Sequence, residues 1–157
     1  MSVLTLHDEF GRWFFTDYFD AWVGLGRDEA PDPTALLDYY AVPIAVGLPD
    51  GFQLLDTADA VIAALVEHQR PLRELGYAGT DVPDKQITVY NRNAASAHAI
   101  WSRHDAGGNE IQRLAAFFHI NRTTDGLRIT SIAFAPTTAD TLAAAWHAAG
   151  CQESATR

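Results

Sequence analysis

The stretch YYAVPIAVGLPDGFQLLD, residues 39–56, indicates the end of a helix followed by two short strands. Apolar side chains occupy every second position from Val42 to Leu48, which is the period of a strand with one buried face. The sequence Pro-Asp-Gly at 49–51 is typical of a tight turn, after which residues 52–56 return as the second strand. Residues 42–48 carry no charge, so the first strand is predicted to form an apolar wall.

Two helices are predicted before this hairpin. Residues 8–25 carry an aromatic stripe at helical steps of three and four, made of Phe10, Trp13, Phe14, Tyr18 and Trp22. A short second helix is predicted over 35–41, with Thr34 as its N-cap and Pro43 as its end.

One more helix is predicted after the hairpin, over residues 58–75, with Asp56 or Thr57 as its cap. Pro71 is expected to kink or end the first part of this helix, and Gly76 to stop the second. One side of it carries Val61, Leu65, His68 and Gln69.

The pattern then changes to strands. After a loop over 76–84, β-rich segments occupy residues 85–92, 93–105, 110–122 and 127–136, with glycine-containing turns before the last two. An alanine-rich helix is predicted over 138–150, with Thr138 as its cap. Strands segregated from helices favour an α+β fold, with a curved antiparallel sheet wrapped around three N-terminal helices as a cone. We predict one domain over residues 1–137 and a helical tail over 138–157.

This order of elements resembles the nuclear-transport-factor-2-like superfamily, in particular its SnoaL-like members. The matching pieces are the aromatic first helix, LLDYYAVPIAV at 36–46, DTADAVIAAL at 56–65 and TTDGLRITSIAF at 123–134. More narrowly, YAVPIAVGLP, AHAIWS and DGLRI are similar to an uncharacterised bacterial SnoaL-like group. The resemblance spans residues 8–136 and implies a cone-shaped barrel with an internal pocket, often a homodimer through the sheet. Members include ketosteroid isomerases, scytalone dehydratases, limonene-epoxide hydrolases, polyketide cyclases and proteins that only bind or assemble, so the fold does not settle the function.

Composition excludes several classes of function. The formal net charge is −9 and Lys85 is the only lysine, which disfavours nucleic acid as a partner. No stretch of about 20 apolar residues is present, so no membrane span is expected. The first ten residues lack a signal-peptide pattern, so we expect a cytoplasmic protein. Cys151 is the only cysteine, which excludes an intrachain disulfide and any metal site made of several cysteines.

The ketosteroid-isomerase pattern lacks its acids here. In that pattern a carboxylate base lies near the end of the first strand, where this chain has Val46, Gly47 and Leu48. Asp50 lies beyond that point and is explained by turn chemistry. The second acid would match Phe117 or Phe118. Proton abstraction by a carboxylate is therefore disfavoured.

Strand alternation assigns the histidines to the outer face. Residues 97, 99, 101 and 103 share one face of their strand, opposite to His98 and His104, and small alanines beside a tryptophan suit a pocket wall. His119 is opposite to Phe118 in the next strand. A bulge would reverse these assignments. The histidines do not converge in sequence, so no metal is expected, and no phosphate-binding or dinucleotide-binding motif indicates a cofactor.

The predicted interior is apolar with few polar groups, which is typical of a small-molecule site. Tyr18 and Arg103 are the candidate catalytic residues, each placed to polarise a carbonyl. The candidate ligand-binding residues are Trp22, Gln69, Trp101, Phe118 and Ser131. Small residues at 131, 133 and 135 are expected to leave room for a ligand.

Three hypotheses for the function remain open. The first is a pocket protein for a hydrophobic or polycyclic compound, resembling polyketides, steroids or terpenoids, with a cofactor-free cyclisation, isomerisation or dehydration if it is catalytic. The second is a non-catalytic binding domain, and the third is a structural dimer with a filled cone.

Overall fold

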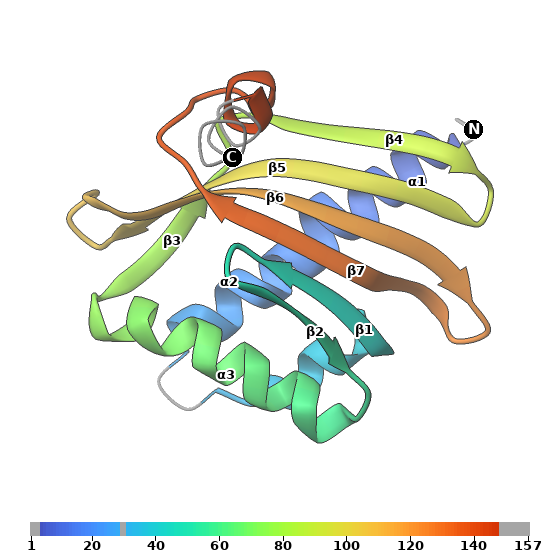
Figure 1. Cartoon of the computed structure of the whole chain (residues 1–157), viewed down its shortest axis with the longest axis horizontal. Coiled ribbons are helices and arrows are strands. Elements are labelled where there is room, and N and C mark those ends of the chain that lie inside the picture. The colour runs from blue at the N-terminus through green and yellow to red at the C-terminus, as the bar shows by residue number, and fades with distance from the viewer. Residues whose placement is uncertain (1–3, 29–30, 148–157) are drawn as a thin grey trace.

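A computed structural model describes residues 4–28 and 31–147 of the chain (Figure 1). The N-terminal segment is one long helix in three parts: α1 (Leu6–Arg12), the π-helical η1 (Trp13–Tyr18) and α2 (Phe19–Arg27). It begins with a capping box in which the Thr5 hydroxyl accepts from the Asp8 amide and the Asp8 carboxylate accepts from the Thr5 amide. The predicted helix over 8–25 is thus confirmed and extends slightly at both ends.

The next segment differs from its prediction. Residues Pro33–Asp38 form a 3₁₀ helix, η2, whose cap is Asp32 rather than Thr34. Strand β1 (Tyr40–Leu48) begins before Pro43, which therefore lies inside a strand and does not end a helix. The Val42–Pro43 peptide bond is cis. Strand β2 (Gly51–Leu55) pairs antiparallel with β1, which confirms the predicted hairpin.

Helix α3 (Ala58–Glu74) is capped by Thr57, whose hydroxyl accepts a hydrogen bond from the Ala60 amide. It continues through Pro71, so the helix does not end there, and the alternative of a kink at Pro71 stays a prediction. The chain leaves the helix at Gly76, where a φ of +81° favours glycine.

Seven strands form one sheet in the order β2-β1-β7-β6-β5-β3, with β4 also paired to β5. The later strands are β3 (Tyr77–Asp81), β4 (Lys85–Asn91), β5 (Ala94–Asp105), β6 (Glu110–Thr123) and β7 (Gly126–Pro136). Strand β3 occupies part of the expected loop, and all pairs are antiparallel except β1 with β7. Figure 1 shows the sheet curving over the N-terminal helix, with α3 across the open side below β1 and β2. The α+β class and the curved sheet are confirmed.

The main core lies between the N-terminal helix and the inner face of the sheet. Phe10 and Phe14 are fully buried, and the Phe14 ring lies 4.8 Å from that of Phe118 on β6. The predicted aromatic stripe is therefore largely core, which fixes the helix beneath the sheet.

A smaller core lies on the outer face. Residues 142–147 are helical, and Leu142 and Ala145 pack on Ile100 of β5 and Ala115 of β6. The Leu142 amide donates to Asp84 at 2.8 Å, and the Thr141 hydroxyl, rather than Thr138, accepts from the Ala144 amide. Residues 148–157 of the predicted tail lie outside the described residues. The division of the chain at residue 137 stays a prediction.

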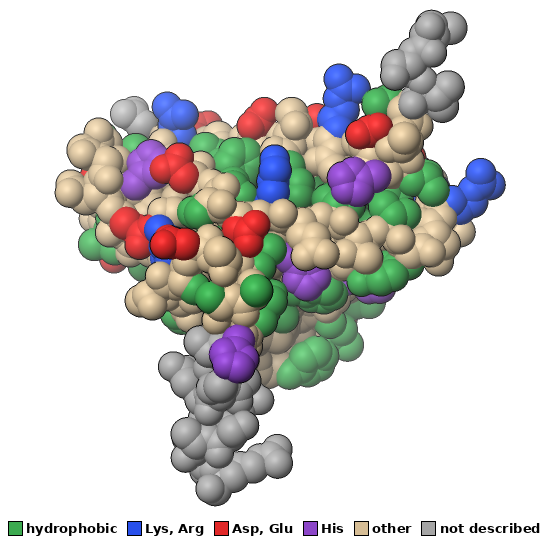
Figure 2. Space-filling view, turned by 90° about the horizontal axis from the view of Figure 1, so that it is seen from above, with side chains coloured by type: hydrophobic (Ala, Val, Ile, Leu, Met, Phe, Trp, Pro, Cys, Tyr) green, Lys and Arg blue, Asp and Glu red, His purple; other side chains and the backbone are tan. Residues whose placement is uncertain are grey.

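The surface carries both signs of charge. On the face shown in Figure 2, Lys and Arg side chains stand apart from one another, with acidic side chains between them. Within residues 4–28 and 31–147, no helix is long and apolar enough to cross a membrane.

Candidate functional site

A cavity of about 490 Å³ opens inside the cone, between the inner face of the sheet, α2 and α3. Most of its lining is aliphatic or aromatic, and its polar side chains come from Tyr18, Tyr40, Gln53, Glu67, His68 and Arg103. Gln53 and Glu67 are exposed, which places the mouth between β2 and α3. The volume lies within the range of small-molecule sites, roughly 300–1,000 Å³.

Five of the seven predicted site residues line this cavity. They are Tyr18, Trp22, Trp101, Arg103 and Phe118. Trp101 and Arg103 reach it because β5 alternates regularly, as the sequence indicated. The Trp101 side chain is also core, since its ring packs 5.7 Å from that of Phe19.

Ser131 does not line the cavity. The inner face of β7 was predicted to carry residues 131, 133 and 135, but Ile132 and Phe134 line the cavity instead. Ile129 pairs with Ile120, whereas Ile132 pairs with Phe118, so β7 uses three residues where β6 uses two. This bulge at Thr130 reverses the alternation and turns Ile132 and Phe134 inward. Large side chains therefore stand where small ones were expected.

Gln69 is buried but does not line the cavity, so that prediction is also wrong. Its Oε1 accepts from Arg73 at 3.3 Å. The preceding residue, His68, lines the cavity instead. Its spacing of three and seven residues from Leu65 and Val61, which also line the cavity, already places it on this side of the helix, but Gln69 was predicted as the site residue instead.

Arg103 is the central polar group of the site and only 5% exposed. Its Nη1 lies 2.9 Å from His68 Nε2 and 2.5 Å from Gln112 Oε1. Its guanidinium carbon lies 4.3 Å from the centroid of the Trp22 ring, a cation–π arrangement. Burial lowers the pKa of Arg103 to about 10, so the group remains a cation at neutral pH.

His68 is neutral beside this cation. Burial, together with the charge of Arg103, lowers the pKa of His68 to about 4. A guanidinium only donates, so His68 Nε2 must accept and the ring proton lies on Nδ1. This imidazole therefore presents a second donor.

Two tyrosines complete the polar part of the wall. The hydroxyls of Tyr18 and Tyr40 lie 2.7 Å apart. Burial raises the pKa of Tyr40 to about 12 and that of Tyr18 well above its usual value, so both stay protonated. Tyr40 was missed because residues 35–41 were predicted as a helix. No regular alternation marks it as a strand residue, because Val42, between the buried Tyr40 and Ile44, is 42% exposed.

A family model described as "NTF2-like protein (DUF6841)" matches residues 8–137. The chain belongs to this NTF2-like family. No curated protein gives a significant match.

Solved structures share the NTF2-like fold at low sequence identity. An NTF2-like protein with a cystatin-like fold from Novosphingobium aromaticivorans is 21% identical with a TM-score of 0.62, over 90% of this chain and 87% of that chain. A candidate ketosteroid isomerase from Parabacteroides distasonis is 12% identical with a TM-score of 0.62, over 88% and 96%. The yeast UBP3-associated protein BRE5 is 13% identical with a TM-score of 0.60, over 87% and 100%. These similarities establish the fold alone.

In this NTF2-like cone, Glu67 supplies the one carboxylate among the cavity-lining residues. Its side chain is 63% exposed at the mouth and forms an ion pair with Arg70. Asp50 is exposed in the β1–β2 turn, away from the cavity. A carboxylate therefore does not project into the interior from the described part of the chain.

Unlike His68 of α3, the histidines of strands β5 and β6 lie outside the cavity. The His98 ring packs against Phe117 and Trp146, and that of His119 against Tyr90. Within the described ranges, no three His, Cys, Asp or Glu side chains converge as metal ligands.

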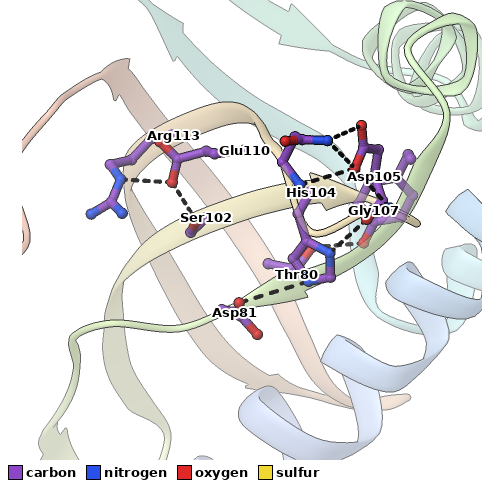
Figure 3. Close-up of polar contacts among 10 residues, drawn as sticks. Thr80, Asp81, Ser102, His104, Asp105, Gly107, Glu110 and Arg113 are labelled. Atoms are coloured by element: carbon purple, nitrogen blue, oxygen red, sulfur yellow. Dashed lines mark hydrogen bonds and ion pairs between the residues drawn. The ribbon is translucent and has the colours of Figure 1, made fainter.

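A polar cluster at the β5–β6 turn contains serine, histidine and acidic side chains, but they are paired separately (Figure 3). Ser102 hydrogen-bonds Glu110, whereas His104 faces Asp81 at 3.7 Å. Because the serine is bonded to a carboxylate and not to the imidazole, this cluster is not a nucleophile–base pair.

Proposed function

We propose that this NTF2-like chain is a SnoaL-like pocket protein that binds one small hydrophobic or polycyclic molecule inside its cone. The observation that carries the proposal is the 490 Å³ apolar cavity, which opens to solvent between β2 and α3. The same cavity argues against a filled cone that acts only as a dimerisation domain. Polyketide-, steroid- and terpenoid-like compounds have the rigid apolar bodies that suit such a lining.

A dye-binding experiment tests this proposal. Nile red, a neutral apolar dye, is expected to gain fluorescence in the wild-type protein. Ala64 lines the cavity from α3, so Ala64→Trp should fill the space and reduce the fluorescence gain at least tenfold. Val66, on the same helix, is 46% exposed and lies outside the lining, so Val66→Trp is the matched control and should bind dye as wild type does. Absence of dye binding by the folded wild-type protein would contradict the proposal.

Catalysis is a second candidate, favoured by the donors that face this apolar space. A carbonyl oxygen near Arg103 and the tyrosine hydroxyls would be polarised, which assists cyclisation, isomerisation or dehydration. No cofactor is invoked. With a substrate in hand, Tyr18→Phe and Arg103→Gln should each lower kcat at least tenfold; unchanged kcat would rule out these catalytic roles.

A further inference from the structure

The cavity wall holds a positive charge that lacks a counter-charge within the described chain. Among residues 4–28 and 31–147, Arg103 takes part in no ion pair. By contrast, Arg113 is paired with Glu110 and Asp140, and Arg122 with Glu9. Arg103 instead contacts three neutral groups: an amide, an imidazole and an indole. A buried cation without an anion is costly, so its presence calls for a partner.

The guanidinium also has unused donors. Its Nε is buried and has no hydrogen-bond partner in the described part of the chain. Both bonds that it makes to other side chains use Nη1, so within those residues the hydrogens of Nη2 have no acceptor. A guanidinium whose other amino group is free can still donate to an incoming oxygen.

The neighbouring polar groups are donors as well. His68 carries its proton on Nδ1, because Nε2 accepts from Arg103. In the Tyr18–Tyr40 pair one hydroxyl donates to the other, which leaves the accepting hydroxyl a hydrogen to give. A cation and neutral donors therefore lie among the residues that line the cavity, and the complement of such a set is an oxygen anion.

The lining away from Arg103 indicates the chemistry of the remaining part of the ligand. Away from Arg103 the wall is aliphatic and aromatic, contributed by Ile44, Val46, Leu55, Leu65, Ile132 and Phe134. One arginine balances one negative charge, which suits a carboxylate better than a phosphate dianion.

We propose that the ligand is an amphipathic carboxylic acid whose carboxylate pairs with Arg103 in the cavity wall and whose apolar body fills the space between the sheet and α3. This inference rests on the proposed function and specifies the chemical class of its ligand. It also assigns Arg103 to anion recognition, with His68 and Gln112 holding its guanidinium in place.

Matched neutral and charged ligands test the proposal. Nile red displacement from the wild-type protein is measured with 2-naphthylacetic acid and with its methyl ester, and then with decanoic acid and its methyl ester. Each acid should displace the dye at a concentration roughly 10–100-fold lower than its ester, the ratio expected when a charge-assisted hydrogen bond is gained.

Variants identify the residue responsible. Arg103→Met should bring acid and ester to within about twofold of each other, while Nile red binding remains. Arg70→Met removes an exposed arginine near the mouth and should leave the acid preference as in wild type, which excludes general attraction to positive charge. If Arg103→Met fails to fold, the comparison of acids with their esters on the wild-type protein still tests the proposal.

The ways in which the test can fail are distinguishable. If Nile red binds and acids displace it no better than esters, the carboxylate proposal is overturned and the pocket proposal stands. The carboxylate proposal is likewise overturned if a folded Arg103→Met retains the full acid preference. If the dye does not bind the wild-type protein at all, the proposed function itself fails.

Discussion

His68 shows how burial and one contact across the fold together set a protonation state. It lies 35 positions from Arg103 in sequence, yet their nitrogens are 2.9 Å apart. Burial, and to a smaller extent the adjacent cation, opposes protonation of the imidazole, so its pKa falls from 6.5 to about 4. An imidazole that stays neutral at pH 5–7 keeps Nε2 free to accept from the guanidinium.

This pKa shift predicts a loss of stability in mild acid. Between pH 6.5 and about 4 the unfolded chain protonates His68 and the folded chain does not, so the unfolded state binds more protons. The His68 contribution is retained above pH 6.5, and the free energy of unfolding should fall by up to about 3 kcal/mol as the pH drops to 4. Urea unfolding at several pH values measures the fall.

His68→Gln removes this titration, so its stability should depend less steeply on pH over the same interval. The exposed His7→Gln is the control and should follow the wild-type curve. Parallel curves for wild type and His68→Gln would show that the histidine is not held neutral by the fold.

At the scale of elements, close packing of α2 on β3 depends on one glycine. A Cβ on Gly26 would lie 2.7 Å from Cε1 of Tyr77. That ring is fixed, because it packs 5.8 Å from the Trp22 ring and its hydroxyl bonds Thr80 at 2.6 Å. The helix end can approach the strand only because position 26 has no side chain.

Gly26→Ala should therefore destabilise the protein by about 1–3 kcal/mol through overpacking. An added Cβ on Gly24, in the same helix, would lie in open space, so Gly24→Ala should instead stabilise by about 0.5–1 kcal/mol through helix propensity. Thermal unfolding of both variants gives the comparison. Equal effects of the two substitutions would show that Tyr77 yields to the added methyl group.

Some elements follow from local sequence and others do not. The aromatic stripe of the first helix and the alternation of β5 and β6 are strong, and the structure confirms both. Strand β3 escaped prediction because it has five residues and contains Gly79. Pro43 was taken as a helix stop, yet it lies where pairing of β1 with β7 is interrupted, between Tyr40 and Ala45, so its missing N–H costs no ladder bond there.

At the scale of the whole molecule, residues 142–147 join the predicted tail to the domain. Leu142 and Ala145 cover Ile100 and Ala115 on the outer face, and these four side chains are at most 6% exposed. The outer face of β5 and β6 is also the side on which a sheet-to-sheet homodimer would form. That dimer stays a prediction, and any such interface would have to lie beside this helix.

Ending the chain at residue 137 should lower the free energy of unfolding by roughly 3 kcal/mol, because Ile100 loses its cover and the burial of Leu142 is lost. A chain that ends at residue 147 retains both contacts and should unfold close to the full-length temperature. Calorimetry on the three chains decides the domain boundary. If the chain that ends at residue 137 is as stable as full length, the division at 137 is correct and the tail is independent.

The sequence by itself determined the types of the long elements, the inner faces of β5 and β6, and the lack of a carboxylate at the end of β1, because these depend on neighbours within one element. The tertiary structure alone decided which polar groups meet: Arg103 with His68, and Tyr18 with Tyr40. It also decided the bulge at Thr130, which exchanged Ser131 for Ile132 in the cavity wall. Such contacts and register shifts depend on packing summed over the whole cone, which no local period encodes.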